Sequence, residues 1–230
     1  MFRWVRAYAS AAADPTSIAV VSAHGPSTVL VVFDLVGIFV FAISGALVAV
    51  RKELDVFGVL VLAGTTGLGG GFLRAVLIGA TPPAALADWR YLLVPVVAGV
   101  AAFTWHPAFA RLERTVNVLD ACGLGLFCVT GALKALDLGL GPAPAALMGM
   151  LTGIGGGMLR DLLASRVPVI FRGELYATPA LAGAAVVVVG VHHLPLLLIA
   201  ALGGGLCTSW RLLAIWRHWQ APLPRGSASV

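Results

Sequence analysis

Two stretches of this sequence follow one pattern: Thr66-Gly67-Leu68-Gly69-Gly70-Gly71-Phe72-Leu73-Arg74 and Thr152-Gly153-Ile154-Gly155-Gly156-Gly157-Met158-Leu159-Arg160. In each, a glycine run interrupts a long apolar segment and an arginine follows three residues later. A glycine inside a helix costs about 1 kcal/mol relative to alanine, so these runs predict helices that bend or unwind. Unwound backbone in hydrocarbon must be paired by protein or water. We therefore predict that both helices are broken at the glycines, face each other and line a polar path. The alternative is that unbroken helices pack tightly there.

The composition indicates a membrane protein. The chain has 230 residues, of which 60% are hydrophobic and 11% charged, and its mean hydropathy is +0.98. A soluble domain carries about 25% charged residues. The net charge of +5 includes no basic run longer than two residues, so we expect it to set membrane orientation and attract anionic lipids rather than nucleic acid. No nucleophile–base pair, metal-ligand cluster or nucleotide loop is present in the sequence, so we expect neither an enzyme nor a cofactor.

The apolar segments are each close to the ~20 residues that cross a bilayer as a helix. They predict an all-α polytopic protein with seven transmembrane helices, at about residues 29–50, 56–80, 91–110, 116–136, 142–164, 175–191 and 195–216. This transmembrane domain, 29–217, is expected to lie between extramembrane tails at 1–28 and 218–230.

The loops predict the orientation. Nine arginines and lysines fall on one side of the membrane and three on the other, which places the N-terminus outside and the C-terminus in the cytoplasm. Arg211 and Arg217, with neighbouring tryptophans, are typical of an anchor at the membrane interface.

The glycine pattern belongs to a longer internal repeat. Shifting Asp34–Arg74 by 86 positions aligns it with Asp120–Arg160 without a gap, and 15 of the 41 positions are identical. Repeat one then covers 29–110 and repeat two 116–191, with the helix at 195–216 outside both. Each repeat holds three spans, and because three is odd the second copy is expected to be inverted in the membrane. Inverted repeats with discontinuous helices place a solute path at the repeat interface.

Five motifs extend over most of the chain: Phe41-Ala42-Ile43-Ser44-Gly45-Ala46-Leu47, Gly69-Gly70-Gly71-Phe72-Leu73-Arg74, Asp88-Trp89-Arg90-Tyr91-Leu92, Thr130-Gly131-Ala132-Leu133-Lys134 and Gly155-Gly156-Gly157-Met158-Leu159-Arg160-Asp161. With them the chain resembles the prokaryotic branch of the TRIC family, the trimeric intracellular cation channels, which also takes in glycine-transporter-like bacterial membrane proteins. The resemblance implies a homotrimer in the prokaryotic inner membrane. It further implies one K⁺-conducting pore per protomer, walled by the second and fifth helices kinked at their glycines. The family often has Arg-Asp after both glycine runs, whereas the first copy here reads Arg74-Ala75.

The candidate site residues fall into three groups. The pore wall and kinks are predicted at Thr66, Gly69, Gly70, Gly71, Thr152, Gly155, Gly156 and Gly157. The pore charges or gate are predicted at Arg74, Arg160, Asp161 and Lys134, and a polar network at Asp34, Asp120, Ser44 and Thr130.

Each group has a simpler interpretation. The two arginines can snorkel to the headgroups, Lys134 can pair locally with Asp137, and the two hydroxyls can bond to their own helices. Asp161 follows Arg160 directly, so on a regular helix the two point about 100° apart, and Asp161 is expected to reach an arginine on another helix.

The sequence leaves the transported species open. Two arginines and a lysine alone favour an anion or a carboxylate, whereas free carbonyls at a helix break replace part of a K⁺ hydration shell. The cation comes from the resemblance. Two alternatives are a transporter for a small zwitterion such as glycine, and a non-conducting membrane assembly protein. The expected partners are K⁺ ions, membrane lipids and further copies of the chain.

Overall fold

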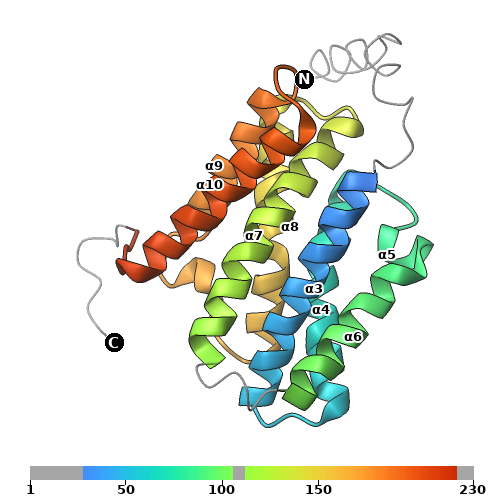
Figure 1. Cartoon of the computed structure of the whole chain (residues 1–230), viewed down its shortest axis with the longest axis vertical. Helices are drawn as coiled ribbons and strands as arrows, with labels where there is room; N and C mark the ends of the chain where they lie inside the picture. The colour runs from blue at the N-terminus through green and yellow to red at the C-terminus, as the bar shows by residue number, and fades with distance from the viewer. Residues whose placement is uncertain (1–27, 106–111, 222–230) are drawn as a thin grey trace, which may run out of the picture.

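The computed structural model describes residues 28–105 and 112–221, and within these ranges the chain is all-helical (Figure 1). In chain order the helices are α3 (Thr28–Arg51), α4 (Val56–Ile78), α5 (Ala84–Ala87), α6 (Trp89–Trp105), α7 (Leu112–Asp137), α8 (Pro142–Leu163), a short 3-10 turn (Val169–Phe171), α9 (Ala177–Gly190) and α10 (Leu196–Trp216).

The helix ends follow from local sequence. Asp55 caps α4, because its Oδ1 accepts a hydrogen bond from the backbone N–H of Gly58 at 2.7 Å. The same helix stops at Gly79, which has the left-handed φ of 68° that glycine adopts without strain. Helix α8 begins with Pro142, whose missing N–H is not needed in a first turn.

Each of the seven predicted segments contains one of the longer helices, with ends that differ by a few residues. By length and composition, α3, α4, α7 and α10 qualify as membrane spans, and α6 and α9 are shorter apolar helices. That all seven cross the membrane stays a prediction. Residues 106–110 of the third segment and most of both predicted tails lie outside the described residues.

The centre of the bundle consists of α3, α4, α7 and α8, which pack against one another (Figure 1). Helix α6 packs on α3 and α4, α9 packs on α7 and α8, and α10 packs on α7 and α9. The two predicted glycine helices, α4 and α8, are therefore direct neighbours, as expected of helices that face each other.

The glycine runs do not unwind their helices. Both α4 and α8 are continuous through the glycines, so the prediction of broken backbone is wrong. A Cβ built on Gly70 would overlap the carbonyl oxygen of Thr152, and one on Gly156 would overlap that of Thr66. The missing side chains allow the two backbones to touch, which is the tight-packing alternative. A bend within a continuous helix stays a prediction.

The close contacts at the glycines occur in pairs: when each residue is replaced by its counterpart 86 positions away in the other repeat, the contact is found again. Phe41 packs on Gly123 as Phe127 packs on Gly37, and the two phenylalanine rings stack with centroids 5.3 Å apart and planes at 29°. Where the helices of one copy touch, those of the other touch at the matching residue.

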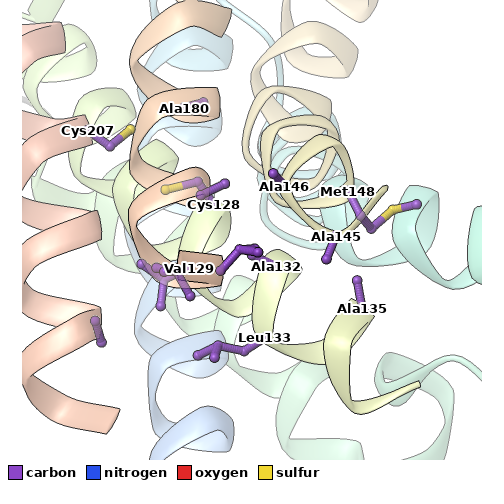
Figure 2. Close-up of a cluster of buried hydrophobic side chains, with 14 of the residues drawn as sticks. Cys128, Val129, Ala132, Leu133, Ala135, Ala145, Ala146, Met148, Ala180 and Cys207 are labelled. Carbon is purple, nitrogen blue, oxygen red and sulfur yellow. The ribbon is translucent and has the colours of Figure 1, made fainter. Parts of the chain in front are cut away.

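A second layer of small side chains fills the space between α7, α8, α9 and α10. Figure 2 shows Ala132 of α7, Ala145 of α8 and Ala180 of α9 within this cluster, all fully buried. The side chain of alanine is a single methyl group. Helices α7, α8 and α9 therefore approach one another closely at these positions.

Candidate functional site

Arg160 is the centre of a buried polar cluster in the second repeat. It lies on α8 and is only 3% exposed. Its Nη1 donates to Asp120 Oδ1 of α7 at 2.6 Å and to Ser44 Oγ of α3 at 2.8 Å. Its Nε donates to Asp161 Oδ1 at 3.0 Å. Two residues of the predicted polar network, Asp120 and Ser44, and the predicted pore charge Asp161 are thus brought together around one guanidinium, and the snorkelling alternative for Arg160 is wrong.

Asp161 pairs with the arginine beside it, which corrects the prediction that it reaches another helix. Its Oδ1 lies 3.0 Å from Arg160 Nη2 as well as from Nε. The 100° rule describes where Cβ atoms point, and the long arginine side chain turns back far enough to reach its neighbour. Asp161 Oδ2 accepts from the backbone N–H of Val169 at 3.1 Å, which ties α8 to the 3-10 turn.

Asp34 is the centre of a matching cluster in the first repeat. The Asp34 side chain is buried on α3, and its Oδ2 accepts from Lys134 Nζ of α7 and from the Tyr91 hydroxyl of α6, the latter at 3.3 Å. Arg74 Nη2 of α4 forms an ion pair with the same oxygen at 3.6 Å. Lys134 therefore pairs with Asp34 rather than with Asp137, and Arg74, which is 6% exposed, does not snorkel.

The two clusters differ in charge. The second combines one arginine with two carboxylates, and the first combines two cations with one carboxylate. The difference comes from two positions: Asp161 is matched by Ala75 in the first repeat, and Lys134, which joins the first cluster, is matched by Val48. In the first cluster, Arg74 Nη1 and Asp34 Oδ1 are buried without a hydrogen-bond partner among the described residues.

The three threonines of the predicted site do not extend these clusters. Thr66 Oγ1 donates to Leu62 O at 2.6 Å and Thr152 Oγ1 to Met148 O at 2.7 Å, each within its own helix. Thr130 Oγ1, the counterpart of Ser44, is buried and has no partner within residues 28–105 and 112–221.

Sequence reasoning missed two tyrosines and misplaced Arg211. Tyr91 and Tyr176 are buried beside the two clusters, and they are 85 rather than 86 positions apart, so the ungapped repeat did not align them. Arg211 is 3% exposed, which rules out the predicted interface anchor for this residue. It donates to Glu174 Oε2 at 2.7 Å, and its guanidinium carbon lies 4.9 Å from the Tyr176 ring centroid.

The Asp88-Trp89-Arg90 motif has a structural role at the start of α6. Asp88 Oδ1 accepts from the backbone N–H of Arg90 at 3.0 Å, and the Arg90 side chain donates to both carboxylate oxygens. These hydrogen bonds lower the pKa of the Asp88 carboxyl below its ordinary value.

Comparison with known proteins gives this geometry a family. A family model described as "Glycine transporter" matches residues 31–107 and 117–192. A "UPF0126 membrane protein" of Deinococcus radiodurans is 45% identical over 189 residues, which cover 81% of this chain and 87% of that protein. A solved TRIC trimeric intracellular cation channel orthologue from Rhodobacter sphaeroides is 39% identical with a TM-score of 0.80, and the match covers 83% of this chain and all of that one. The chain belongs to the TRIC/UPF0126 family. The resemblance stated from the sequence is thereby confirmed.

Other relatives agree on the class of protein. A "UPF0126 inner membrane protein" of Escherichia coli is 38% identical over 194 residues, covering 83% of this chain and 93% of that protein. A prokaryotic TRIC channel crystallised in KCl is 31% identical with a TM-score of 0.76, covering 83% of this chain and 98% of that one. The chain is a membrane protein whose family and fold are those of channels and transporters.

Proposed function

We propose that this chain is a K⁺-permeable cation channel of the prokaryotic inner membrane, assembled as a homotrimer with one pore inside each protomer. The observation that carries the proposal is the similarity to the Rhodobacter TRIC channel at 39% identity over that channel's full length. The match covers 83% of this chain with a TM-score of 0.80, so the two proteins share the arrangement of the helices.

The pore wall is assigned to α4 and α8, as parts of two inverted repeats plus α10. The family model matches two segments whose starts are 86 residues apart, and the contacts at Gly37 and Gly123 are reciprocal under the same shift. With three spans per repeat, the second copy is inverted, the N-terminus lies outside and the C-terminus lies in the cytoplasm. The charged side chains of the two clusters then lie inside the bundle. Such side chains are stable within a membrane only if they line a water-filled path or pair with one another.

On this proposal, the described conformation is a closed state of the channel. At Gly70 and Gly156 the backbones of α4 and α8 are too close to admit even a methyl group, so an ion passes only beside this contact. The carboxylates of Asp34 and Asp120 are the groups on that route that attract a cation, and each is occupied by protein cations. Lys134 is the gate candidate, because moving one charge through the membrane field is worth about 2.3 kcal/mol per 100 mV.

Planar-bilayer recording of purified protein tests the proposal. Unitary currents in KCl with a reversal potential that follows the K⁺ gradient are the expected result. Arg160→Ala should change conductance or selectivity, and an unchanged channel would remove the role of that residue. Silence in both this assay and the uptake assay below would leave a non-conducting assembly protein.

A second candidate is a transporter of a small zwitterion such as glycine. It is favoured by the description of the matching family model, "Glycine transporter". Saturable glycine uptake into liposomes, without unitary currents, would support it over the channel.

A further inference from the structure

The first cluster leaves one buried donor and one buried acceptor unpaired. Tyr91, Lys134 and Arg74 all direct a donor to Asp34 Oδ2, so Oδ1 is left over. Arg74 turns Nη2 toward Asp34, which leaves Nη1 without a partner in the part of the chain that the structure describes. Buried polar groups of folded proteins are almost always hydrogen-bonded, to protein or to ordered water.

A small cavity adjoins both residues. Its volume is about 20 Å³, and Asp34, Arg74 and Tyr91 belong to its lining. Residues 83–85, at the start of α5, and Gly71 of α4 also line this cavity. A single water molecule needs roughly 10–15 Å³ in this measure, so the cavity holds one water and is too small for an amino acid.

The chemistry of the two unpaired groups selects the occupant. Asp34 Oδ1 requires a donor and Arg74 Nη1 requires an acceptor. A metal cation cannot accept from the guanidinium, and a halide cannot donate to the carboxylate. Water does both.

We propose that this cavity binds one water molecule, which donates to Asp34 Oδ1 and accepts from Arg74 Nη1. In the second cluster the place of this water is taken by protein: Arg160 donates to Ser44 and to Asp161, which has no equivalent at position 75. The first cluster is therefore hydrated at the Asp34–Arg74 contact, whereas in the second cluster the Arg160–carboxylate contacts are made by protein alone and only the Tyr176 hydroxyl lacks a partner among the described residues. The water site itself does not depend on the proposed channel function; if the chain is a channel, hydration of the path begins on the Arg74 side.

A pair of glycine substitutions on α4 tests the site. A Cβ on Gly71 lies 4.0 Å from Arg74 Nη2 and meets nothing else within 4 Å, so Gly71→Ala adds a methyl group at the cavity without a clash. Gly64→Ala is the control, because a Cβ there meets nothing within 4 Å. The gain in helix propensity should raise the Tm of the control by about 2–4 °C. Gly71→Ala should show no rise or a fall, since its methyl group displaces the water; equal rises would overturn the proposal.

Radiolytic footprinting in ¹⁸O-labelled water tests hydration directly in the wild-type protein. Hydroxyl radicals formed from a bound water label the side chains next to it. Tyr91, 6% exposed, lines the cavity, whereas Tyr176, 3% exposed, is buried beside the second cluster and serves as the control. Several-fold faster labelling of Tyr91 is expected. Equal, slow labelling of the two tyrosines would show that the cavity is dry and would overturn the proposal.

Discussion

Removing Arg160 should destabilise the protein far more than removing its repeat partner Arg74. Arg160 donates to Asp120, Ser44 and Asp161, and both carboxylates are buried. Arg160→Met leaves these carboxylates without a cation, and breaking a buried ion pair from one side costs about 3–5 kcal/mol. For a chain of this size this corresponds to a fall in Tm of about 6–20 °C.

Arg74→Met is the matched control, because it makes the same chemical change at the equivalent position. Arg74 contributes one ion pair at 3.6 Å, and Asp34 keeps Lys134 and Tyr91 as partners after the change. We expect a smaller loss of about 1.5–3 kcal/mol, the scale of a single hydrogen bond to a charged group.

Thermal unfolding of the detergent-solubilised protein, followed by tryptophan fluorescence, measures both variants. Adding Asp120→Asn and Asp161→Asn to Arg160→Met should recover much of the loss, since no unpaired buried charge then remains. If Arg74→Met lowered the stability as much as Arg160→Met, the different charge of the two clusters would not affect stability. The reasoning would then be refuted.

Three further outcomes are expected. Gly70→Ala should lower the Tm by well over 5 °C, because its Cβ overlaps a backbone carbonyl of α8 that cannot rotate away, whereas Gly64→Ala should raise it; similar values would contradict the contact. Lys134→Met should shift the voltage at which channels open in planar bilayers without abolishing K⁺ current, and an unshifted curve would remove Lys134 as the gate. Arg211→Met should increase hydrogen exchange at Tyr176 and its neighbours, as measured by mass spectrometry, because the guanidinium no longer holds that ring; unchanged exchange would argue against the contact.

The sequence predicted the helices well because hydropathy and length decide where a membrane helix lies. The 86-residue shift also predicted which polar residues cluster, since residues that occupy equivalent places in two copies meet equivalent neighbours. Asp34 and Asp120 were placed in a network on that basis, and each is found beside the arginine of its own repeat.

The sequence failed where the answer depended on a facing element. Glycine weakens a helix and also lets another backbone approach, and only the position of Thr152 against Gly70 shows that the second effect operates here. Arg211 appeared interfacial because it lies among tryptophans near the end of α10. Its partner is Glu174, which is 37 positions away in a loop outside the ungapped part of the repeat. No local pattern carries that information.

The hydrogen bonds of the two clusters cross between the halves of the chain. Ser44 belongs to the first half but accepts from Arg160, and Lys134 belongs to the second half but donates to Asp34. Each arginine pairs with a carboxylate of its own half, Arg74 with Asp34 and Arg160 with Asp120, and the opposite half adds one further polar partner to each cluster. The two clusters also share a helix, because α7 carries both Lys134 and Asp120. A movement of α7 that separates Lys134 from Asp34 would therefore also move Asp120, the partner of Arg160.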